Sequence, residues 1–175
     1  MIKTYSKGDR TYLAENFQAK EFDCKGGECS LTYIDTDLVN YLQKIRTHFG
    51  APVNITSAYR CAAHNKRVGG ATNSYHTKGQ AADFYINGVD TLEIAKYAES
   101  LGIKGIGHYD TFVHIDTRVN KSFWYSSNEE YRSTFGGTPI QTTTPAPVVD
   151  NSKKEALEII SKIETLLAEV KEKLK

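Results

Sequence analysis

A stretch rich in threonine and proline near the end of this chain of 175 residues most constrains what it can fold into. After a Gly-Gly pair, residues 138–151 hold three consecutive threonines and three of the four prolines. This composition is typical of a linker, because proline cannot continue a helix or a central strand. We therefore predict one folded domain over residues 1–136, a linker over residues 137–152 and a separate segment over residues 153–175.

The segment over residues 153–175 has the apolar spacing of an amphipathic helix, which Ser152 can cap. Its apolar positions recur three or four residues apart: Ala156, Ile160, Ile163, Leu167, Val170 and Leu174. Lysine and glutamate occupy the other faces, so the pattern fits three short heptads. We predict that this helix packs on another surface and can mediate homo-oligomerisation.

Charge and hydropathy argue against two classes of protein. The net charge is +1 with both signs mixed along the chain, which provides no basic patch for nucleic acid. No run approaches the roughly 20 apolar residues that cross a bilayer, and residues 1–12 are polar where a signal peptide has an apolar run. We expect a soluble chain that is made in the cytoplasm without a signal peptide; a processed, secreted form would look the same.

Three cysteines cannot all pair within one chain, which argues against a disulfide framework. Cys24 and Cys29 flank a Gly-rich turn and can form one disulfide or half of a structural metal site. Cys61 is distant in sequence, and no second close Cys/His pair completes a four-ligand site. Reduced thiols are therefore the expectation.

Within residues 1–136, apolar periodicity predicts a core helix that begins at Asp35 or Thr36 and ends at Gly50. The apolar stripe of this helix is Leu38, Leu42, Ile45 and Phe49. A capping box of Asp90 and Glu93 begins a second helix.

Four short segments read as strands, and a short helix and loop lie between the first two. The predicted strands are residues 53–58, 80–86, 103–109 and 112–117. The order of elements indicates an α+β domain with a small, mostly antiparallel sheet and flanking helices.

The window from Ser74 to Asp83 holds two side chains that can bind a metal, His76 and Asp83. Strand alternation puts Asp83 on the face opposite Phe84, so the carboxylate can face a site while the ring faces the core. Burying a carboxylate costs free energy unless it is paired or bound to a metal. These two residues alone fit a buried His–Asp pair as well as a metal site.

A second window, residues 112–116, places His114 and Asp116 on one face of a short strand above an apolar base. His114, together with His76 and Asp83, makes a set of two histidines and one aspartate. Three protein ligands leave the fourth tetrahedral position of zinc open, which is the catalytic arrangement.

Several motifs, taken together and in order, resemble the zinc D-alanyl-D-alanine carboxypeptidase family (peptidase family M15), in the subgroup common among phage lysins. The resemblance covers roughly Phe17 to Arg118. Its motifs are Ile55-Thr56-Ser57-Ala58-Tyr59-Arg60, His64-Asn65, Gly69-Gly70, the string from Ser74 to Asp83, Gly105-Ile106-Gly107, and Phe112 to Asp116.

The resemblance implies one zinc ion per chain, held by His76, Asp83 and His114. It also implies that Arg60 grips a substrate carboxylate or polarises the scissile carbonyl, a role that suits the planar guanidinium. The implied substrate is the stem peptide of bacterial peptidoglycan.

The general base is where the sequence departs from the family pattern. Many relatives have an acidic residue three positions before the last zinc histidine, and here that position is Thr111. Asp110 and Asp116 are equal candidates, and His108 is a third. Asp116 can instead orient His114 or bind Arg60.

The resulting expectation is a zinc peptidase of peptidoglycan, acting as a D-Ala-D-Ala carboxypeptidase or an L,D-type endopeptidase. A bacteriophage endolysin, released to the cell wall by other means, fits the expected absence of a signal peptide. The alternative is a zinc-fold protein without catalysis, with a binding role or a structural role in a virion. Under either reading the terminal helix is expected to serve in self-association or wall attachment.

Overall fold

The computed structural model describes residues 1–126 and 138–139. The predicted helix over residues 153–175 and most of the predicted linker lie outside the described residues. Thr138 and Pro139, at the start of that linker, form a two-residue strand.

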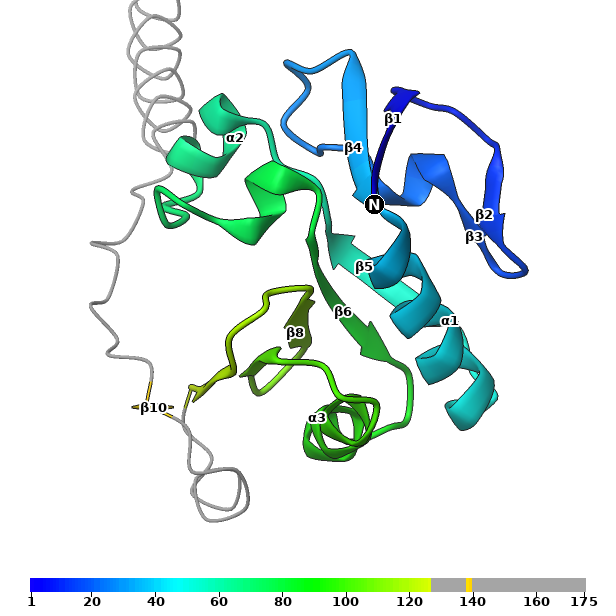
Figure 1. Cartoon of the computed structure of the whole chain (residues 1–175), viewed down its shortest axis with the longest axis vertical. Helices are drawn as coiled ribbons and strands as arrows, with labels where there is room; N and C mark the ends of the chain where they lie inside the picture. Colours follow the sequence, from blue (N-terminus) through cyan, green and yellow to red (C-terminus); the bar gives the residue numbers. More distant parts are fainter. Residues whose placement is uncertain (127–137, 140–175) are drawn as a thin grey trace, which may run out of the picture. The chain divides into compact units, whose positions relative to one another are not determined.

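The described part is an α+β fold, as predicted (Figure 1). Its strands are β1 (Ile2–Ser6), β2 (Tyr12–Ala14), β3 (Phe17–Gln18), β4 (Leu31–Asp35), β5 (Val53–Ser57), β6 (Ala81–Ile86), β7 (Gly105–His108), β8 (Val113–Asp116), β9 (Ser122–Tyr125) and β10 (Thr138–Pro139). Its α-helices are α1 (Thr36–Phe49), α2 (Ala62–Arg67) and α3 (Thr91–Ser100), and its 3₁₀ helices are η1 (Ala19–Phe22) and η2 (Tyr75–Lys78).

The main sheet has six strands in the order β10-β9-β7-β8-β6-β5. The β5–β6, β6–β8 and β8–β7 pairs are antiparallel, whereas β7–β9 and β9–β10 are parallel. Sequence analysis predicted β5, β6, β7 and β8 and a mostly antiparallel sheet. It did not predict β9 or the two small sheets formed by β1 with β4 and β2 with β3.

Helix α1 begins and ends where the sequence predicts. Asp35 is its N-cap, and the side chain accepts a hydrogen bond of 3.2 Å from the backbone N–H of Asp37. Gly50 closes the helix in the left-handed region with φ of 60°, where a side chain would be strained.

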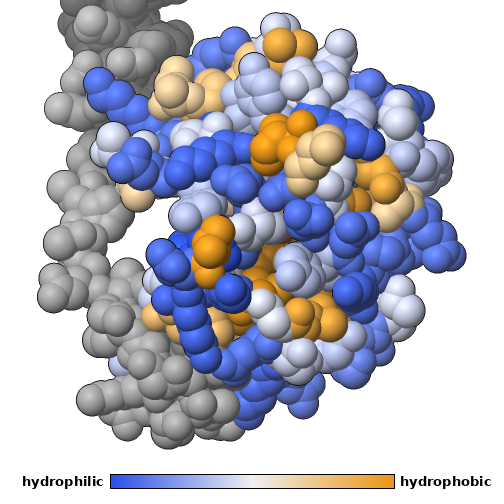
Figure 2. Space-filling view, in the orientation of Figure 1, coloured by the Kyte–Doolittle hydropathy of each residue, from blue (hydrophilic) through white to orange (hydrophobic). Residues whose placement is uncertain are grey.

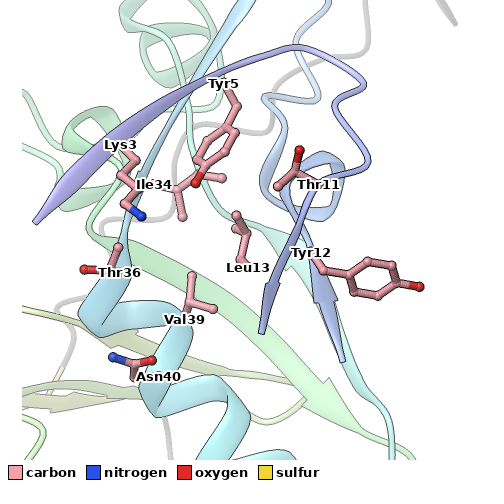
Figure 3. A pocket seen from close by; sticks show the side chains of 9 residues that line it. All are labelled: Lys3, Tyr5, Thr11, Tyr12, Leu13, Ile34, Thr36, Val39 and Asn40. Atoms are coloured by element: carbon pink, nitrogen blue, oxygen red, sulfur yellow. The ribbon is translucent and has the colours of Figure 1, made fainter. Parts of the chain in front are cut away.

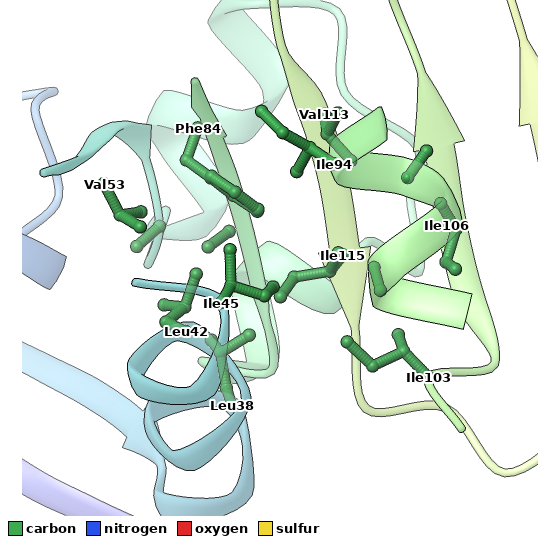
Figure 4. Close-up of a cluster of buried hydrophobic side chains, with 14 of the residues drawn as sticks. Leu38, Leu42, Ile45, Val53, Phe84, Ile94, Ile103, Ile106, Val113 and Ile115 are labelled. Carbon is green, nitrogen blue, oxygen red and sulfur yellow. The ribbon is translucent and has the colours of Figure 1, made fainter. Parts of the chain in front are cut away.

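Helices α1 and α3 cover one face of the main sheet with an apolar core (Figure 4). Leu42 and Ile45 of α1 and Ile94 of α3 are fully buried there, facing Phe84 of β6 and Ile115 of β8. Burying each such side chain contributes about 1.5–3 kcal/mol. Because side chains alternate along a strand, this core directs Asp83 and His114 to the opposite face.

Two glycines of β7 make room on that opposite face. A Cβ atom at Gly105 would lie 2.0 Å from a carboxylate oxygen of Asp116. At Gly107 it would lie 2.4 Å from Nε1 of Trp124. The glycines therefore let Asp116 and Trp124 lie flat against β7.

A separate pocket of about 180 Å³ lies between β1, β2 and α1 (Figure 3). It is lined by Lys3, Tyr5, Thr11, Tyr12, Leu13, Ile34, Thr36, Val39 and Asn40. Among the described residues, two groups of side chains could hold a metal ion, and both lie outside this pocket: Cys24, Cys29 and Cys61, and His76, Asp83 and His114.

The face of the described part seen in Figure 2 is largely hydrophilic, with hydrophobic residues in small patches. Among the described residues no helix is long and apolar enough to cross a membrane.

Candidate metal centre

Three side chains that are distant in sequence meet on the face of the sheet opposite α1 and α3. His76 lies in η2, Asp83 in β6 and His114 in β8. Oδ1 of Asp83 lies 3.2 Å from Nε2 of His76 and 2.7 Å from Nδ1 of His114. The two ring nitrogens lie 3.2 Å apart. The structure thus brings together the three residues that the sequence analysis selected as ligands.

Strand register and a short helix produce this meeting. Asp83 and His114 are direct partners in the antiparallel β6–β8 pair, so their side chains share one face. Ser74 caps η2 by accepting a hydrogen bond from the backbone N–H of His76. Gly79 then ends η2 with φ of +71°, and a Cβ there would lie 2.2 Å from the carbonyl oxygen of Tyr33. Only glycine allows this tight return into β6.

A second partner orients each histidine ring. Nδ1 of His76 lies 2.6 Å from the carbonyl oxygen of Ala58, and Nε2 of His114 lies 3.1 Å from Oδ2 of Asp116. Both partners are acceptors, so these nitrogens carry the protons in the neutral rings. The unprotonated nitrogens, Nε2 of His76 and Nδ1 of His114, then point at each other and at Asp83. This arrangement is typical of metal-binding histidines.

The electrostatics of the cluster also suit a cation. Burial alone would raise the pKa of Asp83, but the imidazoles of His114 and His76 outweigh it when they are protonated and hold that pKa well below its usual value. Burial lowers the pKa of His76, which favours the neutral ring that a metal needs. Burial acts to lower the pKa of His114, yet Asp116 and Asp83 raise it overall. A cation would replace that additional proton.

The donor set therefore fits zinc. Two imidazole nitrogens and one carboxylate oxygen lie within 4.8 Å of one another. The two unprotonated ring nitrogens and the carboxylate oxygen are all acceptors, so a positive charge between them would stabilise the group. These donors match the borderline character of Zn²⁺, and three protein ligands are the number that a catalytic zinc site would use.

The cluster lies in a pocket of about 520 Å³. The pocket is lined by Arg60, Val68, Gly69, Gly70, Ala71, Asn73, Ser74, Tyr75, His76, Asp83, Tyr109, Phe112, His114, Asp116, Arg118 and Trp124. Its volume is in the range of ordinary ligand sites.

Comparison with known protein families matches residues 15–116 to peptidase M15. The chain belongs to the peptidase M15 family. The match spans nearly the same residues as the resemblance carried by the sequence motifs, which is thereby confirmed.

Proteins similar to this M15 chain are named as peptidoglycan L,D-endopeptidases. The Escherichia coli K12 protein named peptidoglycan L,D-endopeptidase MepK is 41% identical over 93 residues, covering 48% of this chain and 51% of the relative. A Haemophilus influenzae protein named probable peptidoglycan L,D-endopeptidase MepK is 38% identical over 94 residues, covering 48% and 50%. The chain thus spans about half the length of these relatives.

Arg60 lies beside the three M15 ligand candidates. Its Nη2 donates to Oδ2 of Asp83 at 3.0 Å, so the two carboxylate oxygens of Asp83 face different partners. Its backbone N–H donates to the carbonyl oxygen of His76, which ties the end of β5 to η2. Nε of Arg60 is buried and has no hydrogen-bond partner among the described residues. Sequence analysis placed Arg60 at the site but did not foresee its ion pair with Asp83.

The three candidates for the general base lie in different places. Asp116 lines the pocket, is 1% exposed, and contacts His114 and Arg118 rather than Arg60. Asp110 is exposed on the β7–β8 turn, where Ser126 donates to it, and it does not line the pocket. His108 lies on the core side of β7, with Nε2 at 2.9 Å from the hydroxyl oxygen of Thr91.

Sequence reasoning missed the aromatic and cationic walls of the pocket. Arg118 forms an ion pair with Asp116 and lies 4.9 Å from the ring centroids of both Tyr75 and Trp124. Nε1 of Trp124 donates to the hydroxyl oxygen of Tyr109 at 3.1 Å. Arg118 stands two residues after Asp116, but no local pattern connects it to Trp124, because only the parallel pairing of β9 with β7 brings them together.

Proposed function

We propose that this chain is a zinc-dependent peptidase that hydrolyses peptide bonds in peptidoglycan stem peptides. The observation that carries the proposal is the cluster of His76, Asp83 and His114, with its free donor atoms aimed at one point beside a pocket. Membership of the M15 family and the peptidoglycan endopeptidase name of the relatives support the same activity.

An L,D-endopeptidase activity is favoured over a D-Ala-D-Ala carboxypeptidase activity. The relatives from both bacteria carry the L,D-endopeptidase name, and their similarity to this chain is 41% and 38%. The matched region covers about half of each relative.

The residues of this chain can divide the work of hydrolysis. When bound at His76, Asp83 and His114, zinc supplies Lewis-acid chemistry that polarises a carbonyl and lowers the pKa of water. Arg60 lines the same pocket with a guanidinium that stays charged at any working pH, so it can bind the substrate carbonyl or carboxylate. Asp116 holds the ring of His114.

The proton of the attacking water needs an acceptor within hydrogen-bond reach. Among the described residues, the carboxylates that line the pocket are Asp83 and Asp116. Both oxygens of Asp116 already accept hydrogen bonds, from His114 and from three N–H groups of Arg118. We propose that Asp116 acts mainly by positioning His114, and that Asp110 takes the proton if the β7–β8 turn moves toward the pocket.

A second candidate function is zinc-dependent binding of stem peptides without hydrolysis. Two positions favour it. Thr111 stands where many relatives have an acidic residue, and Asp110, the neighbouring acid, does not line the pocket. The muropeptide experiment below separates hydrolysis from binding.

The test is mass spectrometry of purified muropeptides after incubation with the full chain loaded with zinc. Cleavage between an L- and a D-centre within the stem supports the endopeptidase, and loss of one terminal D-alanine supports the carboxypeptidase. Activity should disappear with a chelator and return with zinc. Unchanged muropeptides that still bind the zinc-loaded protein would overturn the enzyme and support the binding module.

The proposed biological setting is degradation of the cell wall, as by a bacteriophage endolysin. Added to intact cells or purified sacculi, the chain should then lower turbidity in a zinc-dependent manner. Cleavage of soluble muropeptides without any loss of turbidity would contradict the lytic setting and leave the peptidase in place.

A further inference from the structure

The three cysteines of the chain, which are distant in sequence, meet in one cluster. Cys24 and Cys29 flank the Gly-rich turn that follows η1, and Cys61 is the N-cap of α2. The three sulfur atoms lie within 4.8 Å of one another. The fold therefore supplies the third thiol that the Cys24–Cys29 pair lacks in sequence.

The distances fit a metal site better than a disulfide. Sγ of Cys24 lies 3.8 Å from Sγ of Cys61, whereas a disulfide bond is about 2.05 Å long. Two thiolates on a tetrahedral zinc ion, each about 2.3 Å from the metal, are about 3.8 Å apart. A disulfide would also leave one thiol of the three unused.

Backbone groups are already directed at two of the sulfurs. The N–H of Cys61 donates to Sγ of Cys24 at 3.4 Å, and the N–H of His64 donates to Sγ of Cys61 at 3.5 Å. Such N–H···S bonds stabilise the negative charge of a thiolate, which is the form that binds metal. Cys24 is 1% exposed, so the cluster is partly shielded from solvent.

A fourth donor lies next to the thiols. Oε2 of Glu28 lies 3.9 Å from Sγ of Cys61, and Glu28 also forms an ion pair with Arg67. Arg67 donates to the carbonyl oxygen of Gly26 at 3.1 Å, so the turn is fastened to α2 from its other side as well. Both carboxylate oxygens of Glu28 accept from Arg67, so the side chain would have to turn away from Arg67 to complete four ligands.

We propose that Cys24, Cys29 and Cys61 bind a second, structural divalent cation of thiophilic character, with zinc as the expected ion and Glu28 as the fourth ligand. This site is separate from the His–Asp–His centre and would raise the metal content from the expected one ion per chain to two.

The proposed site has a consequence for the pocket. Cys61 directly follows Arg60, and the N–H of Tyr59 donates to the carbonyl oxygen of Phe22 just before the Gly-rich turn. A metal across this junction would fix the backbone that carries Arg60 beside Asp83. The proposed metal would thus stabilise the part of the pocket wall that Arg60 forms.

Cobalt substitution of the full chain tests the proposal independently of enzymatic activity. Thiolate ligands produce a sulfur-to-cobalt charge-transfer absorption in the near ultraviolet, which a site made only of nitrogen and oxygen donors lacks. The double variant H76A/D83A should keep one cobalt ion and the full charge-transfer band. C29S should lose the band and keep the other cobalt ion, and S100A, an exposed change on α3, should behave as wild type.

Two results would overturn the proposal. One is the absence of a charge-transfer band in cobalt-loaded wild type, when titration after denaturation shows that all three thiols are reduced. The other is a single titratable thiol in protein purified without reductant, which would show that two of the three cysteines form a disulfide. If C29S fails to fold, the spectrum of H76A/D83A decides alone, because that variant leaves every cysteine in place.

Discussion

Oδ1 of Asp83 lies 2.7 Å from Nδ1 of His114, its direct partner across the β6–β8 pair. The same oxygen lies 3.2 Å from Nε2 of His76, and the other oxygen of Asp83 accepts from Arg60. One carboxylate therefore connects the proposed ligand set to the proposed substrate-binding residue.

Removal of this carboxylate should remove the metal at this centre. We expect D83A and H76A to lose zinc from the His–Asp–His centre and to lose turnover, because two protein ligands rarely hold zinc. Isothermal titration with zinc after chelation measures the affinity. Y85F, on the same face of β6, is the matched control. Full retention of zinc at this centre in either ligand variant would move the ligand assignment elsewhere.

Arg60 should act on the substrate and not on the metal. R60K keeps the charge but loses the planar fork, and R60A loses both. If Arg60 stabilises charge that develops on the carbonyl, kcat should fall by about 10²- to 10³-fold, whereas a carboxylate anchor should mainly raise KM. Both variants should bind zinc normally, and K66A on the exposed face of α2 is the control. Wild-type kinetics in R60A would show that the family role does not apply to Arg60.

Asp116 and Asp110 should separate into a positioning role and a proton-transfer role. D116N should weaken zinc binding by about 10- to 100-fold, because the amide holds the ring of His114 less well. D110N should leave zinc binding unchanged. A loss of about 10²-fold or more in kcat at full zinc occupancy would assign the general base to Asp110. An unchanged zinc affinity in D116N would contradict the positioning role.

Asp35 should stabilise the fold in a pH-dependent manner. It caps α1 and accepts a 2.7 Å hydrogen bond from the hydroxyl of Thr117, so D35A should cost about 1–2 kcal/mol. Burial alone would raise its pKa, but the amino group of Met1 and the hydroxyl of Thr117 lower it overall.

Because the folded-state pKa of Asp35 is depressed, its stabilising charge is fully present above the unfolded value of about 3.9. The contribution is lost as the pH falls through the lower, folded value. The difference in unfolding free energy between wild type and D35N should therefore shrink below about pH 4. Urea unfolding at several pH values measures it, and a constant difference would contradict the assignment.

The boundary of the catalytic domain should lie slightly after the position that the sequence suggests. Thr138 and Pro139 pair with Trp124 and Tyr125 of β9, and Trp124 lines the pocket. A truncation after Ile140 should keep activity on small soluble muropeptides, and one after Gly137 should lower stability by removing β10. If the truncation after Ile140 fails to fold, the predicted terminal helix belongs to the catalytic core.

The sequence by itself determined the features that depend on near neighbours. The apolar stripe of α1, its capping by Asp35 and its end at Gly50 are local, because a cap and a period of 3.6 residues act within a few positions. Strand alternation likewise predicted that Asp83 and His114 face away from the core. The resemblance of the ordered motifs to a known family then implied the three ligand candidates that the structure brings together.

Tertiary structure alone decided which side chains meet across the fold. The ion pair of Arg60 with Asp83 and the approach of Cys61 to Cys24 each join segments that no short pattern connects. The parallel β7–β9 pairing that brings Trp124 into the pocket is equally non-local. Such contacts depend on strand order and register, which the burial of the whole core sets, and a local sequence pattern carries no information about them.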